Sequence, residues 1–125
     1  MGGGVVIDPK RITIGITGAT GAIFGVRLLE ALGAAGIETH FVLSKWGQQT
    51  VEHETGLTLT DLRARATVVH GAGNMAATVS SGSFRTEGMV IAPCSMRTLA
   101  AIAHGYGESR VHRAADVVLK ERRKL

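Results

Sequence analysis

A turn rich in glycine and threonine, residues 17–21 (Thr-Gly-Ala-Thr-Gly), is the first segment whose residue types could do chemistry. The apolar run 12–16 precedes it, and a helical pattern of apolar residues, 26–32, follows it. A strand, a glycine turn and a helix in that order bring backbone N–H groups and the positive end of a helix together, which suits a phosphate. The glycines do not have the G-x-G-x-x-G spacing of dinucleotide folds, since they stand at 15, 18, 21 and 25. A phosphate site is the prediction, and a turn that serves packing alone is the alternative.

Two serines follow later apolar runs and could supply hydroxyl groups to the same ligand. Ser44 ends the predicted strand 38–44, where a dinucleotide fold usually carries Asp or Glu for the ribose, so a nicotinamide dinucleotide is disfavoured. Ser95, with Thr98 one turn further on, could hold flavin ring oxygens or a phosphate. Each serine also stands where it would cap the next helix, and capping alone explains both about equally well.

Glu54 and the histidines give no metal-binding pattern. His53 and Glu54 begin like H-E-x-x-H, but Leu57 occupies the position of the second histidine, so the metalloprotease motif is incomplete. The other histidines, at 40, 70, 104 and 112, have no metal-ligand spacing. No metal is therefore predicted, and Glu54 by itself is typical of a surface carboxylate.

One thiol and two cations complete the set of reactive side chains. Cys94 lies before a predicted helix, which could activate it as a nucleophile, but a lone cysteine after an apolar strand is more typical of a small buried hydrophobe. Arg113 and Lys120 are two helical turns apart and share a helix face, so they could hold an anionic substrate. Asp116 lies between them, and an intrahelical charge ladder is an equal alternative.

The elements that must position these residues alternate along the chain. Strands are predicted at 12–16, 38–44, 67–70 and 89–92, and helices at 26–32, 45–55, shortly after Thr60, 95–104 and 111–124. A long loop rich in small and hydroxyl residues, 71–86, precedes the fourth strand. Alternating strands and helices predict a parallel sheet covered on both faces. Because ligands of such sheets bind at the carboxyl ends of the strands, the candidate loops are expected to converge there.

Composition narrows the class of protein. The 125 residues carry 14 Lys and Arg against 10 Asp and Glu, and much of the basic excess lies in 110–124. Aromatic residues make up only 4%, which argues against a stacking platform for nucleic acid. One cysteine suits the reducing cytoplasm, and no apolar stretch has the length of a membrane span. We expect a flexible tail at 1–10, one domain at 11–125, and neither nucleic acid nor membrane as partner.

Five motifs, taken together and in order, resemble the UbiX-type flavin prenyltransferases, including the small subunit of hydroxyarylic acid decarboxylase systems. They are residues 15–22, 43–45, 81–84, 93–99 and 113–123. The resemblance covers 11–125 and implies an α/β fold: a flavodoxin-like or Rossmann-like, doubly wound parallel sheet in three layers. It also implies a homo-oligomer that transfers a dimethylallyl group from dimethylallyl phosphate to FMN. The product, prenylated FMN, would serve a UbiD-type decarboxylase.

The resemblance assigns roles to residues by position. Glu54 and Thr20 would be catalytic, with Glu54 handling a proton during ring closure. The prenyl phosphate would meet Ser81, Gly82, Arg113 and Lys120. FMN would be held by Gly18, Ala19, Thr20, Ser44, Ser95, Met96, Arg97 and Thr98. Arg97 stands where flavin-dependent cysteine decarboxylases should have Asn, which counts against that related activity.

Three departures from the family pattern qualify the resemblance. Met75 stands where some relatives place an aromatic residue, and the segment 109–112 differs from the usual one before Arg113. Relatives also continue past the position of Leu125 into a further strand with an Arg-Glu pair, then a Tyr and a basic residue of the phosphate site. A sheet incomplete at its C-terminal side is therefore expected. A non-catalytic FMN-binding or assembly subunit of an aromatic acid decarboxylase system is the alternative function.

Overall fold

The computed structural model describes residues 10–70, 85–105 and 109–125. Strands and helices alternate along most of the chain, as the apolar runs predict. The elements in chain order are β1 (Arg11–Ile16), α1 (Ala22–Ala34), β2 (Glu38–Leu43), α2 (Lys45–Thr55), α3 (Leu59–Arg65), β3 (Val68–His70), β4 (Gly88–Ile91), α4 (Met96–Ala103) and α5 (Arg110–Lys120).

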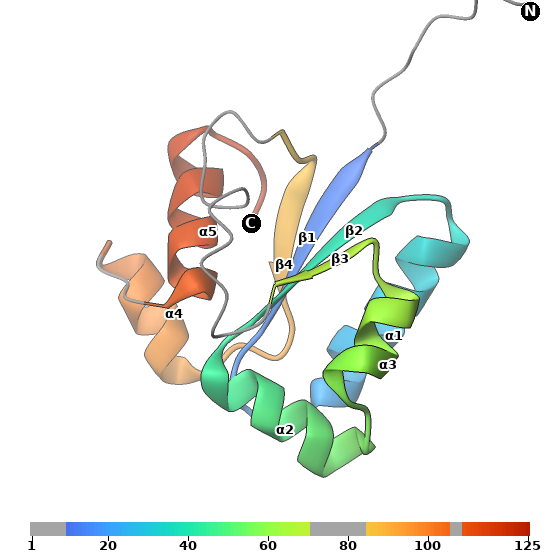
Figure 1. Cartoon of the computed structure of the whole chain (residues 1–125). Helices are drawn as coiled ribbons and strands as arrows, with labels where there is room; N and C mark the ends of the chain where they lie inside the picture. Colours follow the sequence, from blue (N-terminus) through green and yellow to red (C-terminus); the bar gives the residue numbers. More distant parts are fainter. Residues whose placement is uncertain (1–9, 71–84, 106–108) are drawn as a thin grey trace, which may run out of the picture.

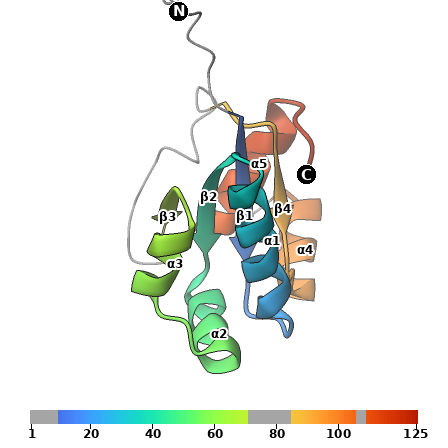
Figure 2. The same cartoon turned by 90° about the vertical axis from the view of Figure 1, so that its right-hand side faces the viewer.

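The strands form one parallel sheet in the order β3-β2-β1-β4. Helices α1 and α3 lie on one side of this sheet and α4 and α5 on the other, while α2 lies at the edge formed by the carboxyl ends of the strands (Figures 1 and 2). The predicted doubly wound, three-layered α/β fold is confirmed. The strand order reverses between β1 and β4, and such a switch point is where these sheets open a crevice for ligands.

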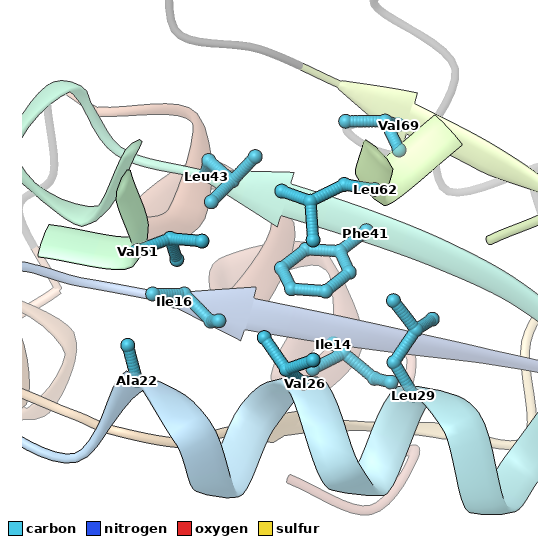
Figure 3. Packing of buried hydrophobic residues seen from close by; sticks show 10 residues of the cluster. All are labelled: Ile14, Ile16, Ala22, Val26, Leu29, Phe41, Leu43, Val51, Leu62 and Val69. Atoms are coloured by element: carbon cyan, nitrogen blue, oxygen red, sulfur yellow. The ribbon is translucent and has the colours of Figure 1, made fainter. Parts of the chain in front are cut away.

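Two apolar clusters hold the layers together, one on each face of the sheet. Phe41 and Leu43 of β2 point into the first cluster, which α1, α2 and α3 complete (Figure 3). Val42, between them in sequence, points to the opposite face and packs in the cluster of Met89 and the apolar side of α5. Successive side chains of a strand alternate between faces. Burial on both faces therefore explains why β2 is apolar without interruption.

The C-terminal helix ends earlier than the sequence predicts. The prediction was a helix to residue 124, because Lys, Arg and Glu all favour helix. Instead α5 ends at Lys120, and Arg122 adopts a left-handed backbone with φ of 57°. The chain then turns back, so that Lys124 forms a parallel bridge with Gly88 and its carbonyl accepts a hydrogen bond from Met89 N–H at 2.9 Å. Pairing along the outer side of β4 therefore replaces the last helical turn.

A charged pair fixes the start of β1 against β2. Arg11 and Glu38 are direct partners in the parallel register, and Arg11 Nε donates to Glu38 Oε2. His40 Nε2 lies 2.9 Å from the same oxygen. The hydrogen bond from His40, assisted by Arg11, lowers the pKa of Glu38 below its ordinary value of 4.5, against the opposing effect of burial.

We expect Glu38→Gln to lower the free energy of unfolding at neutral pH by about 1.5–3 kcal/mol, the range for hydrogen bonds to charged groups. Because the pKa of Glu38 is lower in the folded chain, its contribution is complete above the unfolded pKa and is lost as pH falls through the folded one. Urea unfolding at pH 7 and pH 3 measures this, and the difference between variant and wild type should shrink at pH 3. Glu30→Gln, which removes exposed pairs with Arg27 and Arg65, is the control, with an expected change of at most about 1 kcal/mol.

Candidate functional site

Thr17 joins the ends of β1 and β4 at the point where the strand order reverses. Its N–H and its hydroxyl both donate to the carbonyl of Pro93, at 3.2 and 2.9 Å. The hydroxyl in turn accepts from the N–H of Ser95 at 2.8 Å. The side chain is only 2% exposed. Thr17 therefore has a structural role that the sequence did not reveal: it holds the glycine turn beside the loop after β4, so two of the candidate loops do converge.

Glycines allow α2 to approach this turn closely. A Cβ on Gly18 would lie 2.7 Å from Trp46 Cβ, and one on Gly47 would lie 2.2 Å from the carbonyl oxygen of Ile16. Both distances are far below van der Waals contact, so no other residue fits either position without movement of the backbone. Close packing against α2 therefore explains why residue 18 is glycine. Gly18 is nevertheless exposed to solvent.

Glu54 connects the far end of α2 to the start of α1. Its Oε1 atom accepts hydrogen bonds from Gly21 N–H at 3.1 Å and Ala22 N–H at 3.0 Å. Gly21 has φ of 107°, a left-handed conformation that suits glycine. Because Gly21 provides no side-chain cap for α1, the carboxylate satisfies N–H groups that the helix leaves open. The carboxylate of this solvent-exposed glutamate is therefore held by two backbone N–H groups at the predicted anion-binding turn.

An open pocket of about 340 Å³ lies beside this carboxylate. Its wall is formed by the glycine turn and by one face of α2, where side chains three, four, seven and eight positions after Trp46 project together. The lining residues are Gly18, Thr20, Trp46, Gln49, Thr50, His53 and Glu54. Sequence reasoning proposed roles for Gly18, Thr20 and Glu54 and missed the others. The helical periodicity counted back from Glu54 was the signal that could have found them.

The two serines cap helices, as their alternative explanation predicts. Ser44 Oγ accepts from Gly47 N–H at 2.9 Å, and Ser95 Oγ accepts from Thr98 N–H at 3.1 Å and donates to Thr98 Oγ1 at 2.9 Å. Thr98 is buried, whereas Met96 and Arg97 are exposed at the first turn of α4. Neither serine lines the pocket. Both caps do place the N-termini of α2 and α4 at the carboxyl-end edge of the sheet.

The two candidate cations lie on α5, which packs on one face of the sheet, whereas the pocket lies at the carboxyl-end edge. Val111 packs next to Gly15 near the carboxyl end of β1, whereas Lys124 pairs with Gly88 at the start of β4. Helix α5 therefore runs from the site edge towards the opposite edge. Arg113 lies near its beginning and Lys120 at its end, both exposed. Within one chain the structure does not bring them into the pocket, and Ser81, Gly82 and Met75 lie outside the described residues.

Cys94 is half-buried, and desolvation raises the pKa of its thiol. A raised pKa disfavours the thiolate, which is the nucleophilic form. The described residues contain no group of three or more His, Cys, Asp or Glu placed to hold a metal ion. In the same parts of the chain, no helix is long and apolar enough to cross a membrane.

A doubly wound sheet with a pocket at its carboxyl-end edge is the architecture of a nucleotide- or flavin-binding protein. The family model described as Flavoprotein matches residues 6–125, and the chain belongs to this family.

The relatives agree with the UbiX-type resemblance found in the motifs. A probable UbiX-like flavin prenyltransferase of Streptomyces sp. (strain D7) is 61% identical over 92% of this chain and 58% of its own length. The flavin prenyltransferase UbiX of Escherichia coli (strain K12) is 54% identical over 93% of this chain and 62% of its own. The chain thus spans about three fifths of the length of these relatives. The resemblance to UbiX-type proteins that the five motifs indicate is confirmed.

Solved structures support the same assignment. AnUbiX (PadA1), crystallised in complex with FMN and dimethylallyl pyrophosphate, matches with a TM-score of 0.86 and 50% identity over 93% of this chain and 62% of that one. A dodecameric FMN-dependent UbiX-like decarboxylase from Escherichia coli O157:H7 matches with a TM-score of 0.85 and 54% identity over 92% of this chain and 63% of that one.

Proposed function

We propose that this protein is a flavin prenyltransferase, which transfers a dimethylallyl group from dimethylallyl phosphate to FMN and so makes prenylated FMN. The observation that carries the proposal is the position of Glu54. Its carboxylate is anchored at the start of α1 and opens onto the pocket beside Thr20. The similarity to AnUbiX, which was crystallised with FMN and dimethylallyl pyrophosphate, supports the choice of both substrates.

The donor groups at the pocket edge fit FMN. Gly18, Ala19 and Thr20 would offer backbone N–H groups and a hydroxyl at the turn, and the capped N-termini of α2 and α4 (after Ser44 and Ser95) would add partial positive charge. Residues 95–98 stand at the same edge and would complete the FMN site. The pocket volume lies in the range of sites for small organic ligands. Bound here, FMN would supply the conjugated ring that accepts the dimethylallyl group.

Glu54 and the two cations would have different roles in the reaction. As the bond between the dimethylallyl carbon and the phosphate oxygen breaks, negative charge grows on the phosphate, and Arg113 and Lys120 would stabilise it. Glu54 would take the proton released when the fourth ring closes, with Thr20 beside it. Because neither Arg113 nor Lys120 lines the pocket of its own chain, these cations would act in the site of a neighbouring copy. Ser81 and Gly82 would contact the same phosphate. A homo-oligomer follows, and the dodecameric relative supports it.

The product would be delivered to a UbiD-type decarboxylase. The single cysteine of these 125 residues suits a cytoplasmic setting for the present protein. The enzymatic names of the relatives do not favour the alternative of a non-catalytic FMN-binding subunit.

The test is to incubate the full-length gene product with reduced FMN and dimethylallyl phosphate and to analyse the flavin by mass spectrometry. We expect a flavin heavier by one dimethylallyl group in place of a hydrogen. FMN binding without any such product would contradict the transferase activity and select the binding-subunit alternative. Failure to bind FMN at all would exclude both.

A further inference from the structure

Among the described residues that line the pocket, Trp46 alone carries a large aromatic ring, and it is largely exposed to solvent. The side chain is 64% exposed, although indole is among the side chains that gain most from burial. The other lining groups are hydroxyls, an amide, an imidazole, a carboxylate and glycine. None of the catalytic or binding roles assigned so far involves Trp46.

The backbone beneath this ring is held in place by unusually close packing. The Cβ atom of Trp46 occupies the space that a side chain on Gly18 would need. Its neighbour Gly47 sits directly against the carbonyl oxygen of Ile16 at the end of β1. The Trp46 carbonyl accepts a hydrogen bond from Thr50 Oγ1 at 2.8 Å. An aromatic ring on a rigid base, with its surface open in a ligand-sized pocket, is a ready-made stacking surface.

We infer that Trp46 binds the flavin by stacking its indole ring on the planar isoalloxazine system, an inference that rests on the proposed function. A flat conjugated ring with polar atoms at its rim matches one aromatic surface in a pocket that Thr20, Gln49 and Thr50 also line. Thr20 and Gln49 can donate and accept hydrogen bonds, and Thr50 can accept them. A dimethylallyl chain is aliphatic and would gain little from those groups. The pocket around Trp46 therefore fits the flavin better than it fits the prenyl chain.

The inference also gives Gly18 a definite part in the site. Gly18 lies in the predicted phosphate-binding turn and, by the family resemblance, in the FMN site. In the structure it additionally lets α2 approach the turn, which sets the position of Trp46 relative to Thr20 and Glu54. Flavin affinity should accordingly depend on a residue of α2 that lies outside the five motifs of the family resemblance.

The experiment measures the dissociation constant of FMN for the full-length gene product by calorimetry. Removing an aromatic side chain on which a nucleic-acid base stacks costs about 1–3 kcal/mol. If the flavin ring stacks in the same way, Trp46→Ala should raise the dissociation constant of FMN about 5- to 150-fold. Trp46→Phe keeps a flat ring and should stay within about threefold of the wild type. Trp46→Leu keeps apolar bulk without a flat face and should bind nearly as weakly as Trp46→Ala.

Phe24→Ala is the matched control, because Phe24 is another exposed aromatic residue, 71% accessible, that does not line the pocket. Far-UV circular dichroism verifies folding of each variant, and Trp46→Leu remains decisive if Trp46→Ala is unstable. Subtracting the tryptophan fluorescence of Trp46→Phe from that of the wild type gives the fluorescence of Trp46 alone. FMN binding should quench this difference signal.

Three results would overturn the inference. One is an FMN dissociation constant unchanged in both Trp46→Ala and Trp46→Leu, whether or not the protein makes prenylated FMN. Another is a change in oligomeric state without a change in FMN affinity, which would assign Trp46 to an interface. If the wild type binds no FMN, both the inference and the proposed function fail. Normal FMN binding that depends on Trp46, without prenyl transfer, would support the inference and contradict only the proposed activity.

Discussion

A Glu54→Gln protein will bind FMN normally and form prenylated FMN about 100- to 10,000-fold more slowly than the wild type, the range for loss of a general acid or base. The amide oxygen of Gln can still accept the hydrogen bonds that Gly21 and Ala22 donate to the carboxylate. The start of α1 should therefore keep its geometry. What the variant loses is a group that can take up and release a proton, so the defect should lie in the chemical step.

Glu52→Gln provides the matched control for this prediction. Glu52 is an exposed glutamate on the same helix, two positions earlier, and it does not line the pocket. Its replacement makes the same change in charge and should leave the rate within about threefold of the wild type. Single-turnover formation of prenylated FMN, followed by mass spectrometry, measures both variants. A Glu54→Gln rate close to that of Glu52→Gln would remove Glu54 from the mechanism.

The sheet was predictable because burial on both faces demands continuous apolar sequence. The runs at 12–16, 38–44 and 89–92 lie within one or two residues of β1, β2 and β4. Helix α2 was predicted at its observed bounds, since Ser44 caps its start and Gly56 ends it with a left-handed backbone. Where the start or stop signal is local, single-sequence reasoning located the element correctly.

Helix boundaries set by distant contacts were not predictable. The prediction for the first helix began at residue 26, yet α1 begins at Ala22, because the acceptor for its first N–H groups comes from Glu54 in another helix. The last helix ends early because Lys124 pairs with β4. Contacts between residues distant in sequence also explain why the site was predicted only in part. The sequence identified Glu54 and the glycine turn, but the residue types alone could not show that α2 carries Trp46 to that turn.

Gly25 shows how one glycine spacing can be interpreted in two ways. It is the last of the four glycines at 15, 18, 21 and 25, and a phosphate-binding turn was the prediction for that segment. In the structure Gly25 lies in α1 against the ends of β1 and β4. A Cβ there would lie 2.3 Å from the carbonyl oxygen of Ala92 and 2.7 Å from Ile16 Cδ1. The residue is therefore needed for close packing of helix against sheet, whatever ligand the turn binds.

Gly25→Ala should consequently lower the free energy of unfolding by about 1–3 kcal/mol or more, the cost of overpacking a dense interior. Ile16 can change rotamer, but the Ala92 carbonyl is backbone and can move only if the loop after β4 moves with it. Gly33→Ala is the control within the same helix: a Cβ there meets nothing closer than 3.8 Å, and the higher helix propensity of alanine should stabilise the protein by up to about 1 kcal/mol. Urea unfolding with equal m-values compares the two. Helix propensity favours alanine at both positions, so opposite signs of the change in unfolding free energy would identify a steric effect at Gly25. A stabilised Gly25→Ala protein would show that α1 does not pack on the sheet as described.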